Sequence, residues 1–151
     1  MKRYVLDTNV FVSAARDPAV AAELERFSSA HLPFIHLSAV VAQELLAGAI
    51  DPGKERLIHR ALVEPWERRG RTLSPGFGAW KRAGTLMARL VQRGRLSPGG
   101  FAKSFVNDCL IAASCLEHGA TLVTFNRRDF DLIREVVDLT VEDPFPSLGT
   151  G

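Results

Sequence analysis

The chain has 151 residues, of which 46% are hydrophobic and 24% are charged, and its formal net charge is +2. This length fits one domain with a substantial core, and the composition is ordinary for a globular protein. The small net charge argues against a protein that binds nucleic acid through bulk positive charge. No apolar run approaches the ~20 residues that a membrane span requires, and no signal-peptide pattern opens the chain, so we expect a cytoplasmic protein without a membrane anchor.

Strands and helices are expected to alternate along the chain. Short apolar runs predict strands at 3–6, 34–37, 121–125 and 139–141, with a short extended stretch at 71–75. Helical periodicity predicts helices at 10–15, 17–27, 38–48, from residue 52 onward, at 77–93 and at 101–117, with a short helix after Phe125. Asp17-Pro18 and Ser38 have the residue types that begin helices, and Gly119 the type that ends one.

The helix expected at 77–93 is amphipathic. Its candidate core residues are Trp80, Leu86, Met87, Leu90 and Val91. The helix expected at 101–117 is apolar almost all round, as buried helices are.

This alternation predicts the α/β class, with a central parallel sheet and helices on both faces. The domain is expected to cover residues 1–143, with residues 144–151 as a C-terminal tail. In such sheets ligands bind beyond the carboxyl ends of the strands. Asp7 and Asn126 each follow an expected strand directly, so both are expected to face that crevice.

Charge and cysteine distribution add two expectations. Between Trp66 and Arg134 twelve Lys and Arg residues stand against five Asp and Glu. This local excess favours a phosphate-bearing substrate, although a set of solvated helix faces is the alternative. Cys109 and Cys115 are six residues apart in one expected helix, so they do not face each other, and we expect two buried thiols in a reducing cytoplasm.

Four acidic residues occupy positions where the apolar pattern predicts burial or a strand end: Asp7, Glu44, Asp108 and Asp129. A solitary buried carboxylate is costly unless a cation or a full set of hydrogen bonds compensates it. Each of the four also has a structural alternative. Asp7 is suited to cap a helix, Glu44 to reach solvent from the apolar arc of its helix, and Asp108 to cap a shorter helix that begins near Asn107.

Asp129 follows Asn126 by three residues, as in a helix capping box. This structural role is compatible with a metal site, because a capping Asn126 at a strand tip is also able to hold a metal-bound water. Four carboxylates at close range repel one another unless a cation neutralises them. Oxygen ligands of this kind suit Mg²⁺ or Mn²⁺ rather than Zn²⁺.

The same segments carry a resemblance to a known family. Residues 6–10 (Leu-Asp-Thr-Asn-Val), Glu44 within 38–48, residues 107–113 (Asn-Asp-Cys-Leu-Ile-Ala-Ala) and residues 124–130 (Thr-Phe-Asn-Arg-Arg-Asp-Phe) look like the motifs of PIN-domain ribonucleases. More narrowly, they are similar to VapC-type toxins of toxin–antitoxin pairs. The resemblance spans residues 3–141.

The resemblance implies a Rossmann-like, PIN-like fold and a Mg²⁺- or Mn²⁺-dependent endoribonuclease that holds one or two ions. Asp7, Glu44 and Asp108 would be the core catalytic and metal-binding residues. Some members of the family carry Asp where this chain has Asn126, so Asp129 is expected to supply the fourth acid. A small cognate antitoxin and a homodimer are the implied partners, beside the RNA substrate.

Supporting residues surround these acids in sequence. The supporting candidates are Thr8, Asn9, Thr124 and Asn126. Thr8 and Thr124 are expected to orient a metal-bound water or a phosphate oxygen, and the Asn9 amide is expected near Asp7. Arg127 and Arg128 are candidate contacts to RNA phosphate, with exposed positions in a first helical turn as the alternative.

Two other functions fit part of the sequence. One is a non-catalytic PIN-like module that binds RNA or protein, although an acidic crevice without a metal would repel RNA. The other is phosphate transfer with Asp7 as nucleophile, but the second aspartate expected two positions later is absent, and there is no Gly-rich phosphate loop.

Overall fold

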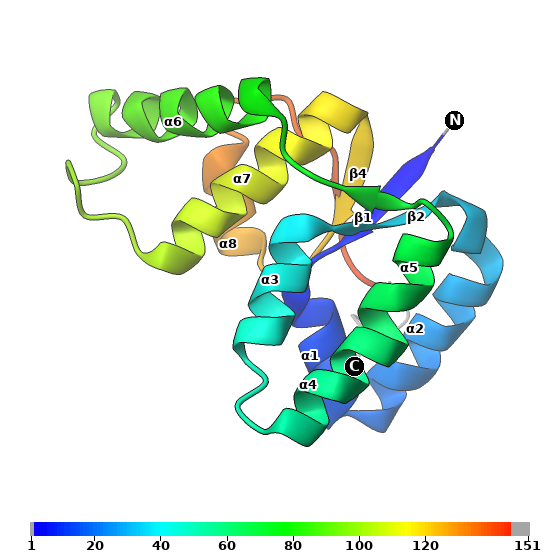
Figure 1. The fold of residues 1–151 in the computed structure, drawn as a ribbon. Helices are drawn as coiled ribbons and strands as arrows, with labels where there is room; N and C mark the ends of the chain where they lie inside the picture. The colour runs from blue at the N-terminus through cyan, green and yellow to red at the C-terminus, as the bar shows by residue number, and fades with distance from the viewer. Residues whose placement is uncertain (1, 146–151) are drawn as a thin grey trace.

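A five-stranded parallel sheet forms the centre of the molecule in the computed structural model, which describes residues 2–145 (Figure 1). Its order is β3-β2-β1-β4-β5. The strands are β1 (Arg3–Leu6), β2 (Ile35–Ser38), β3 (Thr72–Leu73), β4 (Ala120–Val123) and β5 (Val141–Glu142). All pairs are parallel, which confirms the predicted α/β class.

Helices connect the strands. They are α1 (Thr8–Arg16), α2 (Pro18–His31), the short 3-10 helix η1 (Leu32–Phe34), α3 (Ala39–Ala47), α4 (Pro52–Ile58), the π-helical turn η2 (His59–Val63), α5 (Glu64–Arg68), α6 (Phe77–Gln92), α7 (Lys103–His118) and α8 (Arg127–Ile133). The predicted caps are confirmed at Asp17, whose side chain accepts from the Ala19 amide, and at Ser38, which accepts from the Val40 amide. Gly119 ends α7 with φ 64°, in the left-handed region that glycine adopts without strain.

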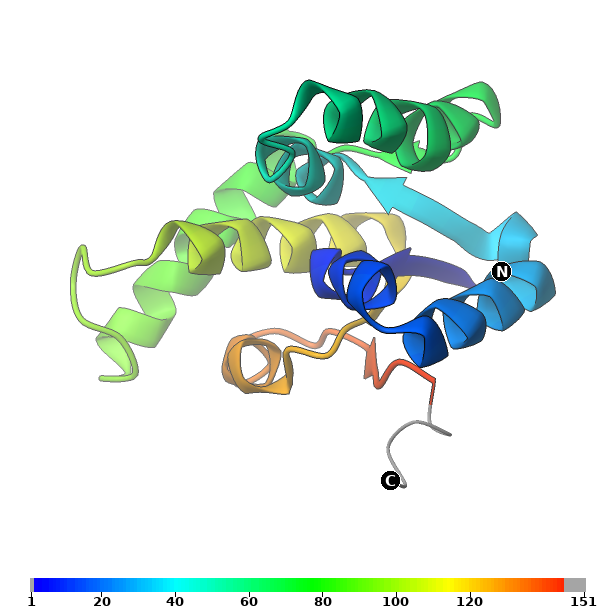
Figure 2. The same cartoon turned by 90° about the horizontal axis from the view of Figure 1, so that it is seen from below.

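Helices cover both faces of the sheet. Alternate residues of each strand point to opposite sides, so each face carries apolar side chains that a layer of helices buries. Val5, Leu37 and Leu122 belong to one core cluster, into which α3, α6, α7 and α8 pack. Tyr4 and Leu6 belong to the other, which α1, α2 and Phe145 complete. The ribbon shows α6 alongside α7, and from below α1 and α2 lie together on their own side of β1 (Figures 1 and 2). Helices on both faces confirm the prediction.

Strand β1 lies at the centre and fixes the position of the site. Leu6 pairs with Val123 of β4, and the backbone amide of Asp7 donates to the Val123 carbonyl at 2.9 Å. The carboxyl ends of β1 and β4 therefore lie side by side. This brings Asp7 and Thr124, which are 117 residues apart, to the same edge of the sheet.

The element boundaries differ from the sequence predictions by a few residues. Helix α1 begins at Thr8 rather than residue 10, because Asp7 already caps it. Strand β2 covers 35–38 because residues 32–34 form η1, and β5 begins only at Val141. Helix α7 begins at Lys103 and not at Phe101.

The prediction that Trp80 belongs to the core is wrong, because its exposed fraction is 57%. Helix α6 buries the stripe formed by Ala79, Ala83, Leu86 and Leu90 instead. Helix α6 turns the side of these two small alanines toward α7. Trp80 follows Ala79 directly, so it lies on the outer face of the helix. Leu86 and Leu90 are core residues as predicted.

The cysteines and the C-terminal segment complete the core. Cys109 and Cys115 are free and buried, as predicted; burial raises the pKa of each thiol to about 12. At the start of the expected tail, Phe145 is buried with its ring centroid 5.7 Å from that of Phe27. Residues 146–151 of that tail lie outside the described residues. Within residues 2–145, no helix is long and apolar enough to cross a bilayer.

Candidate active site

The four predicted acidic residues line one pocket. Its volume is about 300 Å³, and it lies at the carboxyl edge of the sheet between α1, α3, α7 and α8. We call it the acidic pocket. Its lining residues are Asp7, Thr8, Asn9, Val12, Glu44, Ser104, Asp108, Asn126 and Asp129. The structure therefore brings together seven of the residues singled out from sequence, although they come from opposite ends of the chain.

Both carboxylate oxygens of Asp7 accept hydrogen bonds from neighbouring residues. Its exposed fraction is 3%. The Oδ1 atom accepts from the Thr8 amide at 2.8 Å, and Oδ2 accepts from Thr124 Oγ1 at 2.7 Å and from Asn9 Nδ2 at 3.2 Å. Burial raises the pKa of Asp7, while the hydrogen bonds from Thr124 and Thr8 oppose that shift. Asp7 thus caps α1 and also faces the pocket, so the structural role and the site role coexist.

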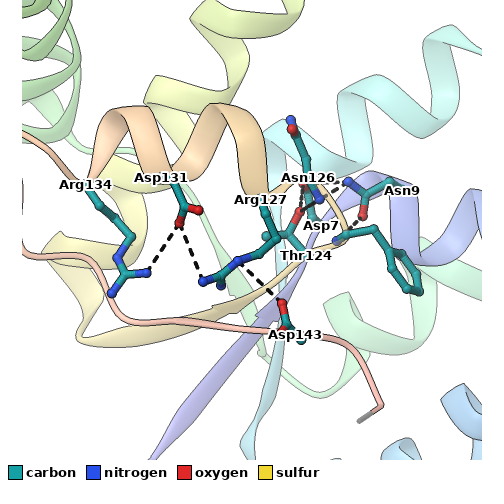
Figure 3. Close-up of polar contacts among 9 residues, drawn as sticks. Asp7, Asn9, Thr124, Asn126, Arg127, Asp131, Arg134 and Asp143 are labelled. Atoms are coloured by element: carbon teal, nitrogen blue, oxygen red, sulfur yellow. Dashed lines mark hydrogen bonds and ion pairs between the residues drawn. The ribbon is translucent and has the colours of Figure 1, made fainter. Parts of the chain in front are cut away.

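Thr124 connects the two strand ends. Its Oγ1 donates to Asp7 and accepts from the Asn126 amide at 2.9 Å and from Asn9 Nδ2 at 3.2 Å. Asn9 completes the connection, because its Oδ1 accepts from the Phe125 amide at 3.1 Å. Figure 3 shows Asn9, Thr124 and Asn126 gathered around Asp7. These polar groups fix the orientation of the Asp7 carboxylate.

We expect Thr124→Val to destabilise the protein by about 2 kcal/mol, because the buried hydroxyl serves three partners that valine cannot satisfy. Thr124→Ser keeps the hydroxyl and is the matched control, with a loss below about 1 kcal/mol. Urea unfolding monitored by circular dichroism measures both variants. Equal stability of the valine and serine variants would show that this hydroxyl contributes only packing.

Glu44 reaches the pocket from α3. Helix α3 buries Val40, Val41 and Leu45, and Glu44 lies at the border of this apolar face with intermediate exposure. Its Oε1 accepts from Thr8 Oγ1 at 2.8 Å. The carboxylate is therefore directed to the acidic pocket by a hydroxyl from the residue that follows Asp7.

Asp108 lies inside α7, in its second turn, so the alternative of a helix cap at this position is wrong. Its exposed fraction is 7%. Burial is the main cause that raises the pKa of Asp108 to about 8, and the charges of Asp7, Asp129 and Glu44 add to it. A carboxyl group of this kind holds a proton at neutral pH unless a cation replaces it.

Asn126 joins the third and fourth acids. Its Nδ2 donates to Asp108 Oδ2 and to Asp129 Oδ2, each at 3.2 Å. Its Oδ1 accepts from the Asp129 amide at 3.3 Å, which is the predicted cap of α8. The amide side chain therefore separates and orients two carboxylates that would otherwise repel each other.

The arginines beside the site have different surroundings. Arg127 pairs with Asp131 and Asp143, each at 3.5 Å, and Figure 3 shows it directed away from Asn126 toward these two carboxylates. Arg128 is exposed and lines a neighbouring pocket. Neither of the two predicted phosphate contacts lines the acidic pocket, and Arg128 alone lines the pocket beside it.

The carboxylates share a pocket without direct neutralisation. In the described part of the chain, none of the ion pairs includes Asp7, Glu44, Asp108 or Asp129. Over the same residues, no three His, Cys, Asp or Glu side chains form a group that could hold a metal ion as they are oriented. The four acids therefore line a common space, and none of them is neutralised by a basic side chain of the described residues.

Two lining residues, Val12 and Ser104, were not identified from sequence. Ser104 lies four residues before Asp108 on α7, and residues at this spacing share a helix face. The helix expected at 101–117 already contained Ser104, so this spacing was available, but an exposed serine carries no cost of burial that would single it out. Val12 supplies an apolar wall and carries no chemical signal of its own.

The fold and the pocket define a PIN domain. The PIN domain family model matches residues 4–136, and the chain belongs to this family. Among its relatives are ribonuclease VapC11 of Mycobacterium tuberculosis and a VapC ribonuclease of Mycobacterium bovis. Each is 29% identical over 137 residues, which cover 89% of this chain and 94% of the relative.

Solved structures give the same fold. The VapBC-1 structure from nontypeable Haemophilus influenzae is 25% identical with a TM-score of 0.68, and the match covers 93% of this chain and 96% of that one. The DNA-bound VapBC structure from Salmonella typhimurium is 22% identical with a TM-score of 0.70, over 95% and 98% of the two chains. The second likeness supports the fold alone. The predicted family is thereby confirmed.

Proposed function

We propose that this protein is a metal-dependent endoribonuclease and the toxin of a VapBC-type toxin–antitoxin pair. The observation that carries the proposal is that four carboxylates of a PIN domain line one pocket and none of them pairs with a Lys or Arg among residues 2–145. The VapC relatives are named as ribonucleases and align over nearly their whole length. The unpaired carboxylates and the ribonuclease relatives both favour cleavage of RNA at a metal site.

The donor set fits a hard divalent cation. Carboxylate oxygens are the ligands that Mg²⁺ and Mn²⁺ prefer, and the raised pKa of Asp108 indicates a site where negative charge lacks compensation. Asp7, Glu44, Asp108 and Asp129 would hold one or two such ions. Among residues 2–145 no three acids are grouped so that they could hold an ion as they are oriented. Glu44 and Asp129 are only partly buried, so their side chains have room to adjust.

A divalent ion in this pocket would lower the pKa of an attacking water and stabilise charge at the phosphate. The chain's own groups do the positioning. Thr124 and Asn9 orient Asp7, Thr8 orients Glu44, and Asn126 orients Asp108 and Asp129. No histidine lines the acidic pocket, so no imidazole is assigned as general base.

The partners follow from the same family membership. We propose RNA as substrate, a small antitoxin as the inhibitor and a homodimer as the assembly, all in the cytoplasm. Several of the structurally similar proteins are described as complexes of the VapBC type or as toxin–antitoxin complexes. Two free buried thiols are compatible with a reducing compartment.

The test is incubation of the purified protein with total RNA in Mg²⁺, Mn²⁺ or EDTA, followed by mapping of the cut ends. We expect defined internal cuts with either metal and none with EDTA. RNA that is bound but left intact under every metal condition would contradict the proposal and favour the non-catalytic PIN-like module. Cleavage that persists in EDTA would contradict the role of the metal.

A further inference from the structure

A second pocket, which we call the flanking pocket, adjoins the acidic pocket. Its volume is about 510 Å³, within the range usual for sites of small organic ligands. Ser104 and Asp129 line both pockets, so the two spaces meet at the first turn of α7 and the first turn of α8. The flanking pocket is therefore the immediate neighbour of the acidic pocket, within reach of the next nucleotide of a polymer bound there.

The charge of the flanking pocket differs from that of the acidic pocket. Arg128 and Arg95 both contribute to its wall. The Arg95 guanidinium donates twice to Glu135 Oε2, at 3.1 and 3.2 Å, which neutralises much of its charge. Arg128 is exposed and takes part in none of the ion pairs among residues 2–145. Its planar guanidinium is suited to hold a phosphate through two parallel hydrogen bonds.

An aromatic side chain completes the flanking pocket. Phe101 lies just before α7, packs partly against the main core cluster and also lines the pocket. The ring is thus supported by the core on one side and accessible on another. Nucleobases of single-stranded RNA stack on rings held in this way.

We propose that the flanking pocket binds one nucleotide of single-stranded RNA next to the scissile phosphate, with its base on Phe101 and its phosphate on Arg128. This inference rests on the proposed function of the acidic pocket. An anionic group is favoured at Arg128, an aromatic base at Phe101, and Ser104 and Asp129 connect the pair to the reaction centre. One nucleotide contains both groups, whereas a lone anion or a lone apolar group would use half of the pocket.

Binding is measured with a short fluorescein-labelled RNA of mixed sequence, in protein that carries Asp108→Asn so that the RNA stays intact. We expect Phe101→Leu, which keeps the apolar packing, to weaken binding roughly tenfold through lost stacking. Arg128→Gln should weaken binding about threefold or more and reduce the slope of log affinity against log salt by about 0.7. The matched controls are Phe77→Leu and Arg82→Gln, both at exposed positions of α6, and these should leave affinity unchanged.

The outcomes separate this inference from the function on which it rests. If Phe101→Leu and Arg128→Gln bind RNA as tightly as the two controls, the flanking pocket is not an RNA subsite and receives something else, such as a protein segment. The subsite is also contradicted if the Asp108→Asn protein without further changes shows no RNA binding at low salt. If the Asp108→Asn protein still cuts RNA while the pocket variants lose affinity, the metal-site assignment fails and the subsite stands.

Discussion

Asp108→Asn is expected to abolish metal-dependent RNA cleavage while making the metal-free protein more stable. The amide would remove one charged ligand of the proposed metal site. A loss of about 4 kcal/mol of transition-state stabilisation would lower the rate about a thousandfold. Stability should rise at neutral pH by on the order of 2 kcal/mol, because the variant no longer places an ionisable carboxyl with a pKa of about 8 in a buried position. Cleavage rates and urea unfolding in EDTA measure the two effects.

The matched control is Asp51→Asn. Asp51 caps α4 at an exposed position away from the acidic pocket, and asparagine caps helices about as well as aspartate. This variant should match the parent in both rate and stability. Cleavage at the parent rate by Asp108→Asn would remove Asp108 from the catalytic set.

Metal is expected to stabilise the parent protein more strongly at about pH 8 than at about pH 5. At a metal concentration one hundred times the dissociation constant, binding adds about 2.7 kcal/mol, which for a chain of this size raises the melting temperature by roughly 5–10 °C. At about pH 5 the proton on Asp108 competes with the ion, so the gain should be smaller. Thermal unfolding with Mn²⁺ or EDTA at both pH values tests this.

The sign of the pH effect in EDTA follows from the direction of the pKa shift. Because the pKa of Asp108 is raised from its ordinary value of 3.8 to about 8 in the folded protein, the folded state binds more protons than the unfolded state between about pH 4 and pH 8. This contribution to stability is full below about pH 4 and is lost as the pH rises through about 8. In Asp108→Asn both the decline and the metal-induced gain should shrink, and an unchanged gain would show that the ion binds elsewhere.

The sequence was most informative where a charge interrupts a strong apolar pattern. Asp108 stands out because the helix around it is apolar on almost all sides. The structure confirms the prediction that this helix is buried and that Asp108 is buried with it. Asp7 and Asn126 were placed at the same edge by the rule for parallel strands, and the pairing of β1 with β4 confirms it. The order of the strands, β3-β2-β1-β4-β5, was not predicted, because strand order depends on long-range pairing that an apolar pattern does not encode.

Features that depend on the exact rotation of helices could not be predicted in the same way. The position of Trp80 depends on which stripe of α6 faces its neighbour, and two alanines decide this. The surroundings of Arg127 depend on Asp143, which reaches it only once β5 is paired with β4. Ser104 already lay inside the helix expected at 101–117, but its side chain is exposed and carries no charge, so the pattern gave no reason to single it out.

The central position of β1 has a consequence for the newly made chain. Domains generally fold as units during synthesis, and Asp7, the first acid of the pocket, leaves the ribosome early. Its partner strand β4 and the last acid, Asp129, emerge only when most of the protein has been translated. An unfinished polypeptide therefore lacks the assembled acidic pocket, and any activity that depends on this pocket begins only after synthesis is nearly complete.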